Sequence, residues 1–222
     1  MSETPVWNRV DQHLSKLFGL VDRALGATLE RSDAEGLPPI QLSDAQGHFL
    51  LLLTRALGAE RVLEIGTLGG FSAILLARGL AEGGIVTSLE VDARHAAVAR
   101  RNIADAGLET RVRVVEGDAH ATLARMVGEG EPPFDLIFLD AEKSGYPAYL
   151  DAMLALARPG TVIIADNVVR EGEILEHGPE DEDAMGVKEF LARVASSPRL
   201  SATVIQTVGS KGHDGFLFAV VE

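Results

Sequence analysis

The chain has 222 residues, a length that fits one sizeable α/β domain and is short for two. Its formal net charge of −13 would repel a phosphate backbone and an anionic membrane surface, so we expect neither nucleic acid nor membrane as a partner. The absence of cysteine excludes disulfides, thiolate catalysis and cysteine-based zinc sites, and the lack of a signal-like start or of an apolar run of about 18 residues predicts a cytoplasmic protein.

The first predicted elements are helices outside any sheet. Apolar residues recur at three- to four-residue steps between residues 4 and 31, which is the period of one or two amphipathic helices. Ser43 and Gln46 form a capping box that opens a further helix running to about Gly58. We expect residues 1–58 to form a helical cap or lid, although a merely solvated cap is equally compatible. The apolar side chains of these helices suit a homodimer, and a monomer that buries them on its own sheet fits as well.

The segment 61–72, RVLEIGTLGGFS, is typical of a buried strand, a tight turn and a helix. Glycine takes positive φ and lets a ligand approach the backbone, while the first helical turn offers unpaired N–H groups. The order Glu64-x-Gly66-x-x-Gly69-Gly70 differs from the G-x-G-x-x-G of dinucleotide dehydrogenases, and its carboxylate would repel a pyrophosphate. The pattern therefore favours S-adenosylmethionine over NAD. The alternative is a glycine turn that only packs the helix on the sheet.

Two further predicted strands end in acidic residues suited to a nucleoside. The run 85–89 ends at Glu90, which is placed to bind the two ribose hydroxyls. The strand 112–115 leads to Asp118, whose carboxylate can accept a hydrogen bond from adenine N6, and to Ala119, whose backbone N–H can reach a ring nitrogen. A surface carboxylate and an ordinary Gly-Asp turn are the alternatives.

Polar residues also end the fourth and fifth predicted strands, 135–139 and 161–165. A right-handed crossover makes these strands parallel, so Asp140 and the pair Asp166-Asn167 emerge at the same sheet edge as the glycine turn. Two carboxylates and an amide oxygen are hard ligands suited to Mg²⁺. Each residue taken alone is also compatible with a simple helix cap.

Lys143 follows Asp140 by three residues. A lysine beside a divalent cation has a lowered pKa, because the two positive charges repel each other, and can then take up a proton. A solvated surface lysine is the alternative.

The rest of the chain predicts a loop, a helix and a hairpin. The segment 168–183 is rich in glycine, proline and acidic residues and is either a cover for the site or a solvated excursion. A helix over 184–197 follows. The runs 202–207 and 216–221 flank the polar turn 209–215 and predict an antiparallel hairpin added to the parallel sheet.

Together these segments resemble the cation-dependent class I O-methyltransferases, which include the catechol and caffeoyl-CoA O-methyltransferases. The resemblance is carried by VLEIGTLGGFS, the strand end at Glu90, GDA at 117–119, FDLIFLDAEKSGYPAY at 134–149 and ADNVV at 165–169. It implies a single domain, with a Rossmann-like core over 59–222. In that fold a seven-stranded, mostly parallel sheet with an antiparallel last strand carries helices on both faces. It also implies S-adenosylmethionine as methyl donor and Mg²⁺, Mn²⁺ or Ca²⁺ as cation.

The resemblance further implies roles for single residues. Lys143 falls on the catalytic base, and Asp140, Asp166 and Asn167 fall on the metal ligands. The positions that match cofactor contacts are Leu42, Glu64, Gly66, Ser72, Glu90, Asp118, Ala119 and Asp140.

The sequence departs from the family pattern at four places. Leu68 stands where the family often has an aromatic residue that contacts the cofactor, and Glu142 replaces an aspartate that is not an expected ligand. The pair Phe190-Leu191 and the turn 209–215 also differ, and these differences concern the substrate.

The implied reaction is methyl transfer to a small aromatic hydroxyl substrate. We expect a vicinal dihydroxy aromatic, because two adjacent hydroxyls chelate a cation, which fixes one oxygen in line with the methyl group and lowers its pKa. Lys143 would remove the proton from the attacking hydroxyl. A nucleotide-dependent oxidoreductase and a non-catalytic S-adenosylmethionine-binding protein are the alternatives.

Overall fold

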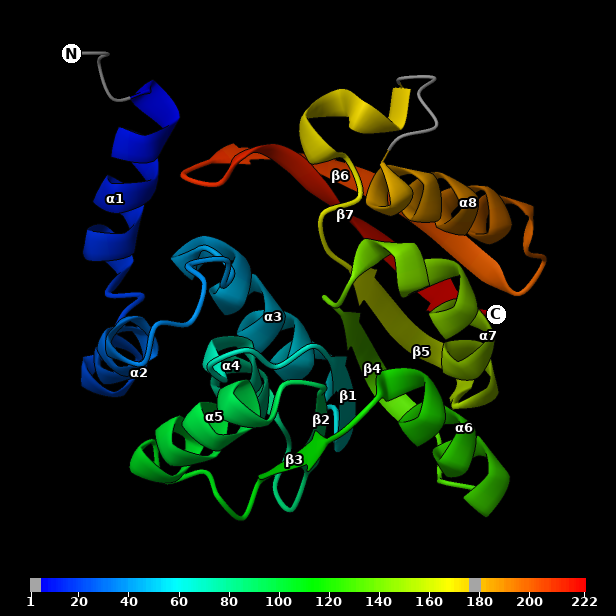
Figure 1. Cartoon of the computed structure of the whole chain (residues 1–222), viewed down its shortest axis with the longest axis horizontal. Helices are drawn as coiled ribbons and strands as arrows, with labels where there is room; N and C mark the ends of the chain where they lie inside the picture. The colour runs from blue at the N-terminus through cyan, green and yellow to red at the C-terminus, as the bar shows by residue number, and fades with distance from the viewer. Residues whose placement is uncertain (1–4, 176–180) are drawn as a thin grey trace.

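A seven-stranded sheet forms the centre of the computed structural model, which describes residues 5–175 and 181–222 (Figure 1). The strand order is β3-β2-β1-β4-β5-β7-β6, and β7 runs antiparallel to β5 and β6 while the pairings from β3 to β5 are parallel. This confirms the predicted sheet. The strands are β1 Arg61–Ile65, β2 Ile85–Glu90, β3 Val112–Glu116, β4 Phe134–Leu139, β5 Ala157–Ala165, β6 Leu200–Gly209 and β7 Gly212–Val221.

Helices cover both faces of the sheet, as predicted. Helices α3, α4 and α5 pack on one face, and α6, α7 and α8 pack on the other. None of the helices within the described ranges has the length and apolar character needed to cross a membrane. The helical segments are α1 Val6–Phe18, α2 Arg23–Ala34, α3 Asp44–Leu57, α4 Phe71–Gly79, α5 Ala93–Asp105, α6 Ala119–Glu129, α7 Tyr146–Ala155 and α8 Glu182–Ser196, with the 3₁₀ turns η1 Lys143–Gly145 and η2 Arg170–Leu175.

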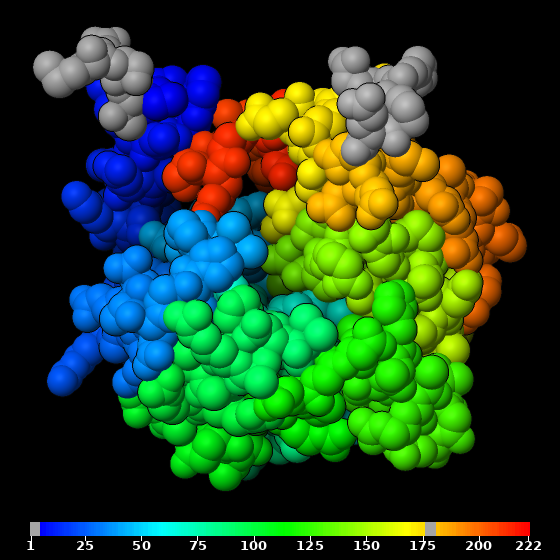
Figure 2. Space-filling view, in the orientation of Figure 1, coloured from blue at the N-terminus to red at the C-terminus, as the bar shows by residue number. Residues whose placement is uncertain are grey.

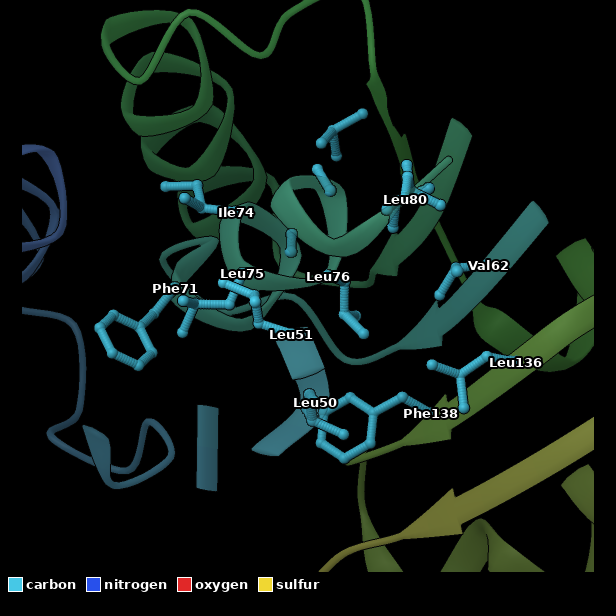
Figure 3. Packing of buried hydrophobic residues seen from close by; sticks show 14 of the residues in the cluster. Leu50, Leu51, Val62, Phe71, Ile74, Leu75, Leu76, Leu80, Leu136 and Phe138 are labelled. Carbon is cyan, nitrogen blue, oxygen red and sulfur yellow. The ribbon is translucent and has the colours of Figure 1, made fainter. Parts of the chain in front are cut away.

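The central strands are apolar along their whole length because both of their faces are buried. Successive side chains point to opposite faces, so Val62 lies in the core under α3 to α5 and Leu63 lies in the core under α6 to α8. Figure 3 shows the first core, where Leu50 of α3 and Leu76 of α4 lie beside Phe138 of β4. Each fully buried side chain of this kind contributes about 2 kcal/mol. Burial on two faces thereby fixes the positions of the strand ends.

The two N-terminal helices lie outside the sheet. All of α1 is described and none of its residues is buried, and Phe18 is 70% exposed. Helix α1 is attached to α3 by a hydrogen bond from the Ser15 hydroxyl to Asp44 at 2.5 Å, while α2 buries Leu25 and Thr28. The lid role of residues 1–58 and the homodimer both stay predictions, and residues 1–4 lie outside the described ranges.

The fifth strand begins earlier than predicted. It starts at Ala157 rather than at Thr161, and the preceding helix, α7, ends at Ala155. The register with β4 shifts in this region, so Pro159 and Gly160 lie in an irregular part of the strand. Pro159 and Gly160 therefore suggested a loop at a point where the chain already belongs to β5.

The final hairpin is longer and tighter than predicted. Pairing continues to Gly209 and Gly212, so the turn consists of Ser210 and Lys211 instead of residues 209–215. The hairpin tip consequently projects beyond the sheet toward α1 (Figure 1).

Helix α6 and the 3₁₀ turns η1 and η2 were not anticipated. Helix α6 begins directly after Asp118, whose side chain accepts a hydrogen bond from Ala121 N at 2.8 Å. The predicted loop 168–183 contains η2 and the start of α8, and its residues 176–180 lie outside the described ranges.

The glycine turn generates a stability prediction. Gly66 has φ of 100°, and a Cβ atom on it would lie 2.0 Å from the backbone oxygen of Asp140. Since a backbone atom cannot rotate away, we expect Gly66→Ala to lower the free energy of unfolding by about 3 kcal/mol, measured by urea denaturation. Gly128→Ala is the matched control, because nothing lies within 4 Å of its added Cβ. Equal losses in the two variants would contradict the packing explanation.

Candidate active site

A cavity of about 1050 Å³ opens at the carboxyl ends of the parallel strands. Figure 2 shows this face hollowed between the N-terminal segment, the hairpin tip and the segment after β5. Glu64 and Asp166 lie behind the cavity wall, with exposed fractions of 0% and 5%. The other predicted site residues line the cavity: Leu42, Gly66, Ser72, Glu90, Asp118, Ala119, Asp140, Lys143 and Asn167.

Glu90 holds the glycine turn in place. Its Oε2 accepts hydrogen bonds from the backbone N–H groups of Thr67 at 3.2 Å and Leu68 at 2.7 Å, and its Oε1 accepts from Asp92 N at 2.9 Å. Leu68 has φ of 50°, a conformation that leucine rarely adopts, so the carboxylate helps to stabilise a strained turn. Glu90 is therefore a buried structural group as well as a residue of the cavity wall, and the alternative of a simple surface carboxylate is wrong.

Glu64 is a buried carboxyl group with an incomplete set of partners. Its Oε2 accepts a hydrogen bond from the Ser88 hydroxyl, and its buried Oε1 has no partner in the described part of the chain. Burial raises the pKa of Glu64 to about 8, with the charges of Asp140 and Glu90 adding to the effect and the Ser72 and Ser88 hydroxyls opposing it. Glu64 is thus protonated at neutral pH, and a cationic ligand group beside it would favour the ionised form.

The two predicted metal-binding carboxylates emerge from neighbouring strands. Leu139 pairs with Ala165, and Asp166 N donates a hydrogen bond to Leu139 O at 3.0 Å, so Asp140 and Asp166 follow matched positions of β4 and β5. Burial, and then the negative charge of Asp140, raise the pKa of Asp166 to about 7. A cation between the two carboxylates would relieve this repulsion.

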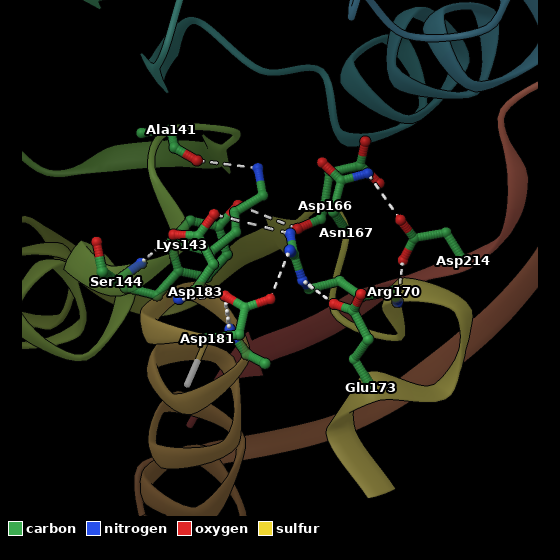
Figure 4. A network of polar contacts seen from close by, with 12 residues as sticks. Ala141, Lys143, Ser144, Asp166, Asn167, Arg170, Glu173, Asp181, Asp183 and Asp214 are labelled. Carbon is green, nitrogen blue, oxygen red and sulfur yellow. Dashed lines mark hydrogen bonds and ion pairs between the residues drawn. The ribbon is translucent and has the colours of Figure 1, made fainter. Parts of the chain in front are cut away.

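Asn167 is oriented by a residue that the sequence analysis missed. Asn167 has φ of 54°, and its Nδ2 donates to Asp214 Oδ2 at 3.0 Å, which leaves its Oδ1 available as an acceptor within the described ranges (Figure 4). Asp214 Oδ1 also accepts from the backbone N–H groups of Val169 at 3.1 Å and Arg170 at 2.9 Å. Asp214 therefore fixes both the amide and the start of η2. It falls within the predicted polar turn, where no local signal linked it to Asn167.

The donor set at this end of the cavity fits a hard cation. The described ranges hold no cluster of three acidic or histidine side chains around one point. A cation here would therefore depend on the carboxylates of Asp140 and Asp166, the Asn167 amide oxygen, and oxygens from water or substrate. That combination suits Mg²⁺ and does not suit zinc.

Lys143 is not a solvated surface residue. It is 8% exposed, and its Nζ donates to Asp140 Oδ1 at 2.8 Å and to Ala141 O at 2.9 Å. The ammonium also lies 5.2 Å from the centre of the Tyr146 ring. These contacts hold the Lys143 amine beside the carboxyl ends of β4 and β5.

The comparison with known proteins establishes the family. The protein family described as O-methyltransferase matches this chain over residues 23–217. The chain belongs to this family. Membership confirms the resemblance and the enzyme class predicted from the sequence, and it decides against the oxidoreductase alternative.

Three proteins illustrate how similar this O-methyltransferase is to its relatives. A protein from Mycobacterium tuberculosis named catechol O-methyltransferase is 48% identical over 100% of this chain and 99% of its own. The crystal structure of an O-methyltransferase from Bacillus cereus in complex with SAH has a TM-score of 0.95, is 49% identical and covers 97% of this chain and 98% of that one. The SAM complex of the O-methyltransferase TomG from Streptomyces achromogenes, which is involved in tomaymycin synthesis, has a TM-score of 0.94 and is 39% identical. It covers 100% of this chain and 99% of its own.

The buried Glu64 generates a pH prediction. The folded O-methyltransferase keeps a proton on Glu64 up to a pH of about 8, whereas the unfolded chain releases it near the ordinary pKa of 4.5, so stability is lost as the pH rises between these values. We expect the wild type to lose up to about 1.4 kcal/mol per pH unit relative to Glu64→Gln, whose amide stays neutral. Urea denaturation at several pH values in this window measures the difference. Parallel pH profiles would mean that Glu64 is already ionised in the folded protein.

Proposed function

We propose that the protein transfers a methyl group from S-adenosylmethionine to one hydroxyl of a small vicinal dihydroxy aromatic substrate, with a divalent cation, Mg²⁺, Mn²⁺ or Ca²⁺. The observation that carries the proposal is that Asp140 and Asn167 line the same cavity as the glycine turn, while Asp166 follows the matched position of the neighbouring strand, behind the cavity wall. The names of the catechol O-methyltransferase relatives support the substrate class. The SAH and SAM complexes of similar structures support the methyl donor.

The order of the strands matches the order of groups in S-adenosylmethionine. Across the sheet from β3 to β1, the cavity presents Asp118 after β3, Glu90 at the end of β2 and Gly66 after β1. In the proposed pose these positions face adenine, ribose and the methionine portion in turn. Ala119 would contact the adenine, while Leu42, Glu64 and Ser72 would contact the methionine end. The next strand, β4, carries Asp140, so the methyl group would lie near the acceptor.

The cation would supply a lower pKa for a coordinated phenol, as it does for bound water. Lys143 would take the proton, and its Nζ, which lies 2.8 Å from Asp140 Oδ1 beside the proposed cation site, supports this role. The acceptor oxygen would then attack the methyl carbon of S-adenosylmethionine in line, so that the bond from sulfur to that carbon would break and S-adenosylhomocysteine would leave.

The first test is metal removal. We expect methyl transfer from S-adenosylmethionine to catechol in the presence of Mg²⁺, loss of this transfer with EDTA, and recovery when Mg²⁺ is added in excess. Phenol serves as the control acceptor and should react much more slowly, because it has no second hydroxyl to chelate the cation. Turnover that survives chelation would remove the metal role from Asp140, Asp166 and Asn167. Cofactor binding without turnover would favour the non-catalytic alternative.

The second test concerns Asp214 as a positioning residue. We expect Asp214→Asn to raise the Mg²⁺ concentration for half-maximal activity by roughly tenfold, because the Asn167 amide loses the carboxylate that orients it. The KM for S-adenosylmethionine should stay the same, since Asp214 does not line the cavity. Asp151→Asn is the control, because Asp151, on α7, is exposed and forms an ion pair with Arg193, on α8. Lower stability with an unchanged Mg²⁺ requirement would contradict the positioning role.

A further inference from the structure

The tip of the β6–β7 hairpin bridges two walls of the cavity mouth. On one side the Lys211 Nζ donates a hydrogen bond to Pro39 O at 2.9 Å, and Pro39 lines the cavity. On the other side His213 N donates to Glu171 Oε1, in η2, at 2.8 Å. Figures 1 and 2 show the tip between the N-terminal segment and the segment after β5, above the hollow. Lys211 itself does not line the cavity in this structure, and its side chain is held beside the rim through the contact with Pro39.

Within the described residues, Lys211 differs from Arg170 and Lys143, which line the cavity, because it forms no ion pair with an acidic side chain. Arg170 lines the cavity and is engaged by three carboxylates at 3.0, 3.5 and 3.9 Å (Figure 4). Lys143 is paired with Asp140. The Lys211 ammonium has three N–H donors, and within the described part of the chain it meets one acceptor, the carbonyl of Pro39. Two donors are left for a ligand.

The position of this amine strengthens its attraction for an anion. Partial burial lowers the pKa of Lys211, while attraction to Asp140 opposes the shift. The amine is thus partly desolvated and within electrostatic reach of the end of the cavity where the acceptor would bind. In such a setting a charge pair is stronger than in bulk water.

The cavity wall between Lys211 and Asp140 suits an aromatic ring. Pro38, Pro39, Ile40 and Leu42 line the cavity next to the Lys211 contact and bring no charge to it. A ring whose hydroxyls lie at Asp140 would place its far side toward this apolar wall and the rim.

We propose that Lys211 selects aromatic acceptors that carry a carboxylate on the side of the ring remote from the two hydroxyls. The inference rests on the proposed catechol-type methyl transfer and deepens it, since it names the class of acceptor. Lys211 acts here as a specificity residue through a charge-assisted hydrogen bond to the carboxylate, and it takes no part in the chemical step.

The test compares acids with their neutral amides. The acceptors are 3,4-dihydroxybenzoate and 3,4-dihydroxybenzamide, the longer pair 3,4-dihydroxycinnamate and its amide, and catechol itself. The proteins are the wild type, Lys211→Met, which keeps the length of the side chain, Lys211→Arg, which keeps the charge, and the control Lys16→Met, which removes an exposed lysine from α1.

For the wild type we expect kcat/KM to be higher for at least one acid than for its amide. Lys211→Met should lower kcat/KM for that acid about tenfold, mainly through KM, and leave the amide and catechol within about twofold, since one charge-assisted hydrogen bond is lost. Lys211→Arg should retain most of the preference, and Lys16→Met should change none of these values.

If Lys211→Met lowered kcat/KM equally for acid, amide and catechol, the inference would be overturned, because Lys211 would then act only through its hydrogen bond to Pro39. The absence of any preference in the wild type, or an equal change in Lys16→Met, would overturn it as well. In both cases catechol is still methylated, so the proposed function survives. Failure of the wild type to methylate any of the acceptors overturns the proposed function, and this inference with it.

Discussion

The close approach of Gly66 to the backbone of Asp140 sets the spacing of the whole site. Gly66 N donates to Leu89 O and Asp140 N donates to Ile65 O, so three adjacent strands are tied together just where they end. Because no side chain fits between the glycine turn and β4, the proposed donor and acceptor regions are held at one fixed separation. Two cores of apolar side chains above and below the sheet make that separation rigid.

Acidic groups crowd this rigid frame, and the protein stabilises each of them differently. Glu90 accepts backbone hydrogen bonds, Asp140 is paired with Lys143, and Glu64 and Asp166 have raised pKa values because they are buried. On the proposed function, S-adenosylmethionine brings a sulfonium and an ammonium group, and the metal brings two further positive charges. The free site therefore carries an excess of acidic groups that its ligands would compensate, which couples protonation, cofactor binding and metal binding in one cavity.

The sequence predicted those parts of the fold and site that depend on short-range patterns. The continuous apolar runs of β1 and β4 predicted buried parallel strands, and polar residues at their ends predicted where the site lies. The hairpin turn was misplaced because glycines and charged residues at 209–215 are typical of a loop, whereas pairing with β6 overrides that preference. The contact of Asn167 with Asp214 spans 47 positions and that of Lys211 with Pro39 spans 172. Neither contact leaves a local signal, since both depend on how the hairpin folds back over the sheet.

The place of β6 at the end of the sheet has a consequence for the protein in concentrated solution. Ten residues of β6 form an outer strand, and Val204, Ile205 and Val208 expose apolar side chains along it. An open edge of this length is a template on which another chain can add a strand, the first step of aggregation. Helix α1 lies against one end of β6, where Asp11 accepts a hydrogen bond from Ser210 N at 2.8 Å. The N-terminal helix therefore hinders strand addition at that end of β6, and the net charge of −13 adds long-range repulsion between copies.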